Sequence, residues 1–159
     1  MTNRPEKGDK APNVTIPVSD EETVNLSKPV GRAHVVYFYP RDNTPGCTTE
    51  SIDFSALKAK FAALDTQIIG VSKDSLKSHA NFIAKKDLTV TLASDADADA
   101  CEQFGTWVEK NMYGKKYMGI ERSTFIILAD GTIAEAWRKV KVKGHAQSVL
   151  EALDTILNV

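Results

Sequence analysis

Residues 34–47 read HVVYFYPRDNTPGC, a strand signal followed directly by a helix signal. After His34 the run to Tyr39 is β-branched or aromatic without a polar gap, which is typical of a central strand buried on both faces. Pro40 ends this run. Thr44 and Pro45 then predict a helix start, with Thr44 as the N-cap and Pro45 as the first helical residue. We therefore expect a buried strand, a short loop and a helix that carries Cys47 in its first turn.

The rest of the chain extends this pattern into an alternation of strands and helices. A polar turn at 19–22 joins the first two expected strands into an N-terminal hairpin, and Ala129 to Thr132 predicts a second hairpin turn. The order predicts an α/β fold with a mixed central sheet flanked by helices. Order alone leaves thioredoxin-like and flavodoxin-like arrangements open. The expected strands are 14–16, 23–26, 34–39, 67–71, 88–92, 123–128 and 133–137, and the expected helices start at Thr44 and Ser94 or cover 75–85 and 145–157.

Length and composition restrict the class of protein. The chain has 159 residues, which indicates a single domain over 1–159. Its 20 Lys and Arg against 21 Asp and Glu give a formal charge of −1, which argues against nucleic acid and a charged membrane surface as partners. The longest apolar stretch, about six residues, is far shorter than the ~20 of a membrane helix. The polar start, Met1 to Asn13, does not resemble a signal peptide. We expect a soluble, cytoplasmic protein.

The cysteines and histidines give no sign of a metal or a cofactor. Two cysteines, Cys47 and Cys101, are too few for a disulfide framework or an all-thiolate zinc site. The three histidines, His34, His79 and His145, show no metal-ligand spacing with them. No glycine-rich nucleotide motif is present. We expect reduced thiols, no metal and no bound cofactor.

The expected position of Cys47 favours a reactive thiol. Free backbone N–H groups and the positive end of the helix dipole meet in a first helical turn, and they favour a thiolate nucleophile. Gly46 lets a small ligand approach the backbone. The alternative is that Cys47 is simply a small buried hydrophobic residue.

Helical geometry adds a charge argument. At ~100° per residue, Cys47 falls within ~20° of Phe54 and Glu50 within ~40° on the other side. A carboxylate on an apolar face needs a partner, and its charge opposes a thiolate nearby. A cation is therefore expected between Glu50 and Cys47. Arg122, which precedes the strand at 123–128, is the best candidate, and Arg41 is the alternative.

The motif around Cys47 resembles a known family. Pro40, Thr44 and Cys47 match the P-x-x-x-T-x-x-C signature of peroxiredoxins, and residues 37–48 look like the peroxiredoxin Q branch, also called bacterioferritin comigratory protein. The resemblance spans nearly the whole chain, with further matches at 8–12, 94–95, 105–110, 112–115, 122–125 and 130–131.

The resemblance implies a thioredoxin-like fold and an antioxidant enzyme that reduces hydrogen peroxide and organic hydroperoxides. Cys47 would attack the peroxide oxygen and become a sulfenic acid. Thr44 would hydrogen-bond the thiolate and the peroxide, and Pro40 would shield the sulfur from water. Arg122 would hold the thiolate and polarise the O–O bond, with Glu50 orienting it. The expected partners are peroxides and thioredoxin or another thiol reductant. The resemblance favours a monomer, with a weak dimer as the alternative.

The sequence departs from the family at the second cysteine. Many members carry a resolving cysteine five residues after the first, but here that position is Ile52, which we expect opposite the core-facing stripe. Others carry it in the next helix, and residues 75–87 contain none. Only Cys101 remains, and nearby acidic residues such as Asp95 would raise the pKa of its thiol.

We therefore expect a one-cysteine mechanism in which an outside thiol reduces Cys47. Resolution by Cys101 is the alternative. A different class of function, a non-catalytic thioredoxin-like binding or holdase module, would leave Cys47 silent. A dithiol oxidoreductase would need a C-x-x-C motif, which is absent.

Overall fold

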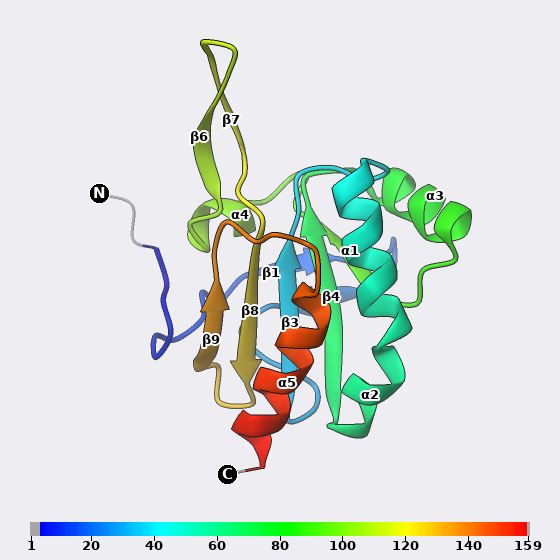
Figure 1. The fold of residues 1–159 in the computed structure, drawn as a ribbon, viewed down its shortest axis with the longest axis vertical. Helices are drawn as coiled ribbons and strands as arrows, with labels where there is room; N and C mark the ends of the chain where they lie inside the picture. The colour runs from blue at the N-terminus through cyan, green and yellow to red at the C-terminus, as the bar shows by residue number, and fades with distance from the viewer. Residues whose placement is uncertain (1–3, 159) are drawn as a thin grey trace.

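A computed structural model describes residues 4–158 and is built on a five-stranded mixed sheet (Figure 1). The strand order is β5-β4-β3-β8-β9, in which β3, β4 and β5 run parallel while β8 and β9 continue antiparallel. Every residue of the central strand β3 is buried, as its apolar run predicts. The strands span Ala33–Phe38 (β3), Thr66–Ser72 (β4), Thr91–Ser94 (β5), Ser123–Leu128 (β8) and Ile133–Trp137 (β9).

Helices and a small hairpin cover the two faces of this sheet. On one face lie α1 (Pro45–Ala56), α2 (Lys58–Ala63), α3 (Leu76–Lys86) and α5 (His145–Leu157). On the other lie the short α4 (Ala100–Gln103) and the predicted N-terminal hairpin of β1 (Thr15–Pro17) and β2 (Thr23–Asn25). The structure thus has the predicted α/β sandwich, and its relatives described below share the thioredoxin-like fold.

The sheet divides the hydrophobic core into two clusters. Side chains alternate along β3, so that Val35 and Tyr37 pack on one face while Val36 and Phe38 pack on the other. The cluster that contains Cys47 is called the Cys47 face below, and the cluster that contains Cys101 is called the Cys101 face. The two thiols therefore lie on opposite sides of the central sheet.

Two predicted elements around β5 were misplaced. The strand expected at 88–92 is β5, three residues later, and the helix expected from Ser94 begins only at Ala100. Ser94 ends β5 instead. The Asp95 carboxylate then accepts the backbone N–H groups of Ala100 and Cys101, both at 2.9 Å, and so caps α4 from outside the helix. The helix thus begins five residues after the acidic side chain that caps it.

The single helix expected after Thr44 is two helices. It breaks at Leu57, whose backbone N–H binds the carbonyl of Phe54 at 3.1 Å in the tighter i−3 pattern. The bend leaves the predicted apolar stripe intact, because Phe54 and Phe61 are both fully buried with ring centroids 6.1 Å apart. Ile52 is exposed, as predicted.

A long hairpin that the sequence analysis did not predict projects from the sheet (Figure 1). It consists of β6 (Trp107–Met112) and β7 (Lys115–Ile120), which form a separate two-stranded antiparallel sheet. The turn residues Tyr113 and Gly114 have φ values of 53° and 81°, the left-handed pair of a two-residue hairpin turn. Tyrosine at the first turn position gives little sequence signal. Within residues 4–158, no helix combines the length and apolar character needed to span a bilayer.

Candidate active site

Cys47 lies in the first turn of α1 and is fully buried. One nitrogen of the Arg122 guanidinium, Nη2, donates to Cys47 Sγ at 3.3 Å. The other, Nη1, donates to Glu50 Oε1 at 2.6 Å. The expected cation between Glu50 and Cys47 is therefore present, and it is Arg122. The alternative, Arg41, is exposed in the loop and does not take this place.

The strand register explains how Arg122 reaches a residue 75 positions away. Ser123, the first residue of β8, pairs with Phe38, the last residue of β3, so Arg122 lies at the end of the sheet where α1 begins. Gly46 makes room for it, because a Cβ at this position would lie 3.2 Å from Arg122 Nη2. The absent side chain of Gly46 thus admits a guanidinium group, where we had expected a ligand.

Burial dominates the electrostatics of Glu50. It raises the pKa of this carboxyl to about 7, although Arg122 opposes the shift. The second oxygen, Oε2, is buried and has no hydrogen-bond partner among the described residues. The pKa of Arg122 is raised, because Glu50 and Cys47 together outweigh the effect of its own burial. The guanidinium therefore stays charged, and near neutral pH Glu50 only partly neutralises it.

Thr44 and Pro40 lie in the loop before α1. Thr44 has the extended backbone of an N-cap, and α1 begins with Pro45 as predicted, but the Thr44 hydroxyl does not cap the helix. It donates instead to the Arg41 carbonyl at 2.9 Å, which tightens the loop. Pro40 is exposed. The suggested roles of Thr44 and Pro40 toward the thiolate and the peroxide stay predictions.

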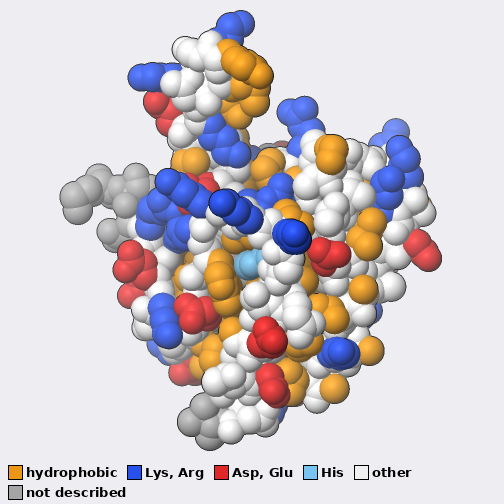
Figure 2. Space-filling view, in the orientation of Figure 1, with side chains coloured by type: hydrophobic (Ala, Val, Ile, Leu, Met, Phe, Trp, Pro, Cys, Tyr) orange, Lys and Arg blue, Asp and Glu red, His pale blue; other side chains and the backbone are white. Residues whose placement is uncertain are grey.

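A groove of about 550 Å³ runs from this loop along the projecting hairpin. Pro40 and Thr44 line one end, and Trp107, Lys110 and Tyr117 are among the hairpin residues that line the rest. Figure 2 shows hydrophobic side chains gathered along one edge of the hairpin, with Lys and Arg side chains around its base. The groove therefore combines apolar hairpin side chains with the charged side chains of Arg41, Lys73, Asp74 and Lys110.

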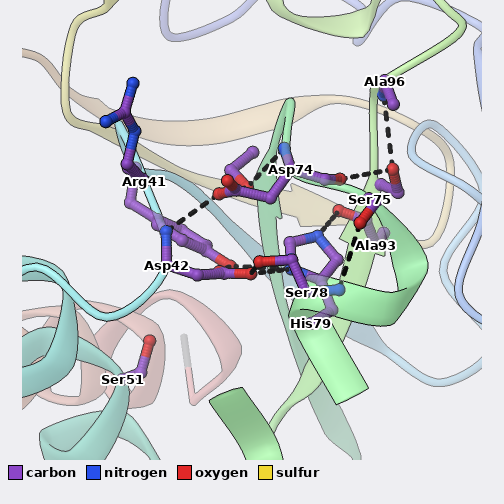
Figure 3. Close-up of polar contacts among 12 residues, drawn as sticks. Arg41, Asp42, Ser51, Asp74, Ser75, Ser78, His79, Ala93 and Ala96 are labelled. Atoms are coloured by element: carbon purple, nitrogen blue, oxygen red, sulfur yellow. Dashed lines mark hydrogen bonds and ion pairs between the residues drawn. The ribbon is translucent and has the colours of Figure 1, made fainter. Parts of the chain in front are cut away.

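The loop is tied to the rest of the protein by one buried side chain, Asp42 (Figure 3). Its carboxylate accepts from the Tyr39 hydroxyl at 2.6 Å, and from His79 Nδ1 and the Ser78 hydroxyl at 2.8 Å each. Its backbone N–H donates to Asp74 Oδ2 at 2.8 Å. Burial alone would raise the pKa of Asp42, but the hydrogen bonds from His79, Tyr39 and Ser78 outweigh it and lower the pKa.

Sequence reasoning missed this group, although one signal was available. His79 lies three residues from both Leu76 and Phe82, which places the three side chains on one side of the helix expected at 75–85. A histidine on an apolar face needs a polar partner, just as Glu50 does. The identity of the partner, Asp42, depends on the packing of α3 beside the loop and has no local signal.

The surroundings of Cys101 differ from those of Cys47, because a carboxylate and not a guanidinium contacts this cysteine. It is fully buried in the first turn of α4, and its backbone N–H is bound by the Asp95 carboxylate. Burial and the Asp95 charge raise the pKa of its thiol well above the usual value. Lys73 pairs with Asp95 at 3.1 Å, so the nearby cation is already shared with a carboxylate.

The other two histidines, His34 and His145, have structural partners. His34 Nε2 lies 2.8 Å from the Leu26 carbonyl, and His145 Nε2 lies 2.8 Å from the Thr124 hydroxyl. Burial lowers the pKa of each histidine to about 4. Across the described part of the chain, no group of three His, Cys, Asp or Glu residues is arranged to hold a metal ion.

Comparisons with known proteins agree on one family. A model of the AhpC/TSA family matches residues 7–136. Peroxiredoxin Bcp of Xanthomonas campestris pv. campestris is 54% identical over 127 residues, which cover 77% of this chain and 79% of that protein. Peroxiredoxin Bcp of Bacillus subtilis is 48% identical over 151 residues, which cover 95% of this chain and 94% of that protein.

A solved structure extends the similarity to three dimensions. The bacterioferritin comigratory protein of Xanthomonas campestris superposes with a TM-score of 0.84 at 47% identity, over 91% of this chain and 92% of that one. That structure belongs to a study of the alkyl peroxide reduction activity of the Xanthomonas protein, based on trapped intermediate and ligand complexes.

Proposed function

The chain belongs to the AhpC/TSA family and is a peroxiredoxin, a thiol-dependent peroxidase, and we propose that it works with one cysteine, Cys47. The observation that supports this proposal most directly is the hydrogen bond from Arg122 Nη2 to Cys47 Sγ. Glu50 in turn holds the Arg122 guanidinium in place. Cys101 lies across the sheet, beside a carboxylate. An outside thiol then completes the cycle.

The first half-reaction oxidises Cys47. Its thiolate attacks the terminal oxygen of the hydroperoxide, so that an S–O bond forms as the O–O bond breaks. The sulfur loses two electrons and becomes a sulfenic acid, which keeps the peroxide proton on its oxygen. The leaving alkoxide, or hydroxide from hydrogen peroxide, takes a proton from water. Arg122 stabilises the thiolate and the charge that develops on the oxygens. Thr44 binds the peroxide, and Pro40 limits access of water.

The second half-reaction restores the thiol. An outside thiol, from thioredoxin or another dithiol, attacks the sulfenic sulfur and releases water, which leaves a mixed disulfide at Cys47. A second thiol attacks this disulfide, regenerates Cys47 and leaves with the reductant as a disulfide. The reductant supplies both electrons, and no metal or cofactor takes part.

The mass of the intact protein after one equivalent of hydrogen peroxide tests this mechanism. We expect a gain of one oxygen, which a sulfenic-acid trap captures at Cys47 in the wild type and in Cys101→Ser. Loss of two hydrogens, with a peptide joining Cys47 to Cys101, would establish the two-cysteine mechanism instead. An unchanged mass would argue against the peroxidase site itself.

Organic hydroperoxides are the substrates that the groove along the hairpin favours. Its end lies at Pro40 and Thr44, and its apolar wall gives an alkyl or aryl substituent room beside the reacting oxygens. The alkyl peroxide reduction studied for the Xanthomonas protein supports the same substrate class. Tyr117→Ser should reduce the rate constant for cumene hydroperoxide about threefold to tenfold and leave that for hydrogen peroxide unchanged. Equal effects on both peroxides would contradict this substrate class.

We also propose a cytoplasmic monomer. A cytoplasmic location supplies the thiol reductants that a one-cysteine enzyme needs, and both cysteines are free. The exposed Met112, Tyr117 and Met118 on the hairpin are the surface on which a weak dimer would form. Light scattering across a hundredfold range of concentration, together with cell fractionation, tests both statements.

A further inference from the structure

The buried position of Cys47 creates a problem for the second half-reaction. Cys47 is fully buried, and the Cys47 face contains no other cysteine. If the proposed one-cysteine mechanism holds, the peroxide and then an outside thiol must both reach this sulfur, and a dithiol needs a wider opening than a hydroperoxide group. The loop at 40–44 or the first turn of α1 must therefore move during each cycle, and the contacts that hold this segment set how readily it moves.

We propose that Asp42 and His79 form a latch that holds the loop at 40–44 closed while Cys47 reacts with peroxide. Release of the latch then opens the loop and lets the outside thiol reach the sulfenic acid. Asp42 and His79 are positioning residues in this proposal, because they act on the reaction through the segment that carries Thr44 and Cys47.

The pattern of burial in the loop identifies Asp42 as the anchor. Pro40, Arg41 and Asn43 are exposed, Thr44 is half-buried, and Asp42 alone among the five loop residues is buried. Figure 3 shows Asp42 directed toward Ser78 and His79 on α3, while the Arg41 side chain extends away from them. The loop thus has little apolar contact of its own, and the bonds of one side chain supply most of its attachment to α3.

Both ring nitrogens of His79 take part in this attachment. Nε2 faces the Ala93 carbonyl at 3.0 Å and Nδ1 faces Asp42 Oδ2 at 2.8 Å. The ring is thus held between a backbone carbonyl and the Asp42 carboxylate, which fixes its orientation. The His79 and Asp42 side chains are only 2% and 4% exposed. Charged hydrogen bonds in such a site are strong, and removal of one partner leaves the other buried without compensation.

The remaining contacts add a second bond from α3 and extend the latch to the end of β4. The Ser78 hydroxyl adds a second bond from α3 to Asp42, and Asp74, which follows β4, accepts the Asp42 backbone N–H. The Ser72 hydroxyl fixes Asp74 Oδ2 at 2.7 Å. The loop is therefore pinned at a single residue to a helix and to the end of a strand. A change at any of these partners should act on the loop before it acts on the hydrophobic core.

The test separates the two half-reactions in His79→Gln and in the milder Ser78→Ala. Stopped-flow measurements follow first the oxidation of reduced protein by hydrogen peroxide, and then the reduction of the preformed sulfenic acid by dithiothreitol. For His79→Gln we expect oxidation about tenfold slower and reduction about tenfold faster, because loss of a charged hydrogen bond favours the open loop. Ser78→Ala should shift both rates in the same directions by about threefold.

His34→Gln is the matched control. His34 is also a buried histidine bonded to a backbone carbonyl, but its partner Leu26 belongs to the Cys101 face. A general loss of stability would affect this variant as well, whereas release of the latch would not. Unchanged half-reactions in both His79→Gln and Ser78→Ala would overturn the proposal, as would equal effects in His34→Gln. Failure of the wild type to form a sulfenic acid would instead overturn the proposed function.

Discussion

Cys47 and Cys101 are two similarly placed thiols in different electrostatic surroundings, and they can be compared within one molecule. Both are fully buried, both lie in the first turn of a helix, and both contact an apolar cluster on the central sheet. The Cys47 sulfur accepts a hydrogen bond from the Arg122 guanidinium, whereas the Cys101 backbone is bound by the Asp95 carboxylate. Burial and helix position therefore do not distinguish the two thiols, whereas the charge of the group that contacts each cysteine does, and our proposed roles for Cys47 and Cys101 rest on this difference.

The largest effect should come from removal of the thiols themselves. Cys47→Ser should lower peroxide consumption with dithiothreitol by more than about 1,000-fold, to the background rate, because no other group can accept the oxygen. Cys101→Ser should retain at least about half of the wild-type rate. Loss of activity in Cys101→Ser, with the fold intact by circular dichroism, would reverse our assignment of the two thiols.

Arg122→Met should make the surroundings of Cys47 resemble those of Cys101, with a carboxylate nearby and no cation hydrogen-bonded to the sulfur. We expect the rate constant for oxidation by hydrogen peroxide to fall by about 100-fold to 1,000-fold, because the thiolate and the transition state lose their charged donor. Arg122→Lys restores the charge but not the two-pronged geometry, so it should recover only part of the rate. A decrease of less than threefold in Arg122→Met would show that the guanidinium is not essential.

Asp95→Asn makes the reverse change at Cys101. Removal of the carboxylate should lower the pKa of the Cys101 thiol toward its usual value, although burial still keeps it raised. Weaker capping of α4 should also reduce the free energy of unfolding by about 1–2 kcal/mol. Iodoacetamide labelling in a Cys47→Ser background should therefore become about tenfold faster at pH 8. Labelling that stays as slow as in the parent would mean that burial alone protects Cys101.

Glu50→Gln should have the smallest effect, and it should appear in the pH dependence of stability. The folded protein holds a proton on Glu50 up to about pH 7, whereas the unfolded chain releases it near pH 4.5. The resulting stabilisation is complete below pH 4.5 and is lost as the pH rises to about 7. In urea unfolding at pH 5 to 8, the wild type should lose on the order of 1–2 kcal/mol over this range relative to Glu50→Gln. If the free energies of unfolding of the wild type and of Glu50→Gln changed in parallel with pH, a raised pKa of Glu50 would be excluded.

The lowered pKa values of His34 and His145 change the stability with pH in the opposite direction from Glu50. They contribute equally to the wild type and to Glu50→Gln. Each group is near pKa 4 when folded and 6.5 when unfolded, so each costs stability as the pH falls from about 6.5 to 4. The difference between wild type and variant therefore isolates Glu50.

Local patterns were sufficient to predict the core of the active site. The helical angles of Cys47 and Glu50 placed both groups on the buried side of α1, and the need for a counter-ion identified Arg122. The Asp42–His79 pair was missed because its partners lie 37 residues apart and meet only through the packing of α3 on the loop. Charge balance around a buried helix face is encoded locally, whereas the choice of a distant partner is not.

The fold shows the same division between local and distant information. The strand β3 was predicted from its continuous apolar run, and the predicted bounds of β8 and α5 match those of the structure. The projecting hairpin was missed because its strands are largely exposed and its turn carries a tyrosine in place of the usual residues. Elements that bury little surface leave little pattern in the sequence.

The projecting hairpin contacts both the Cys101 face and the groove beside the loop that precedes Cys47. Trp107 and Ile120 at its base pack on the Cys101 face, its flank lines the groove that ends at Thr44, and Tyr113 at its tip is 99% exposed. A fluorophore at position 113 would therefore stand in solvent at the tip of a hairpin whose base contacts the core. Such a label could report each oxidation cycle as a change in signal, which would turn the enzyme into a peroxide sensor without alteration of its core.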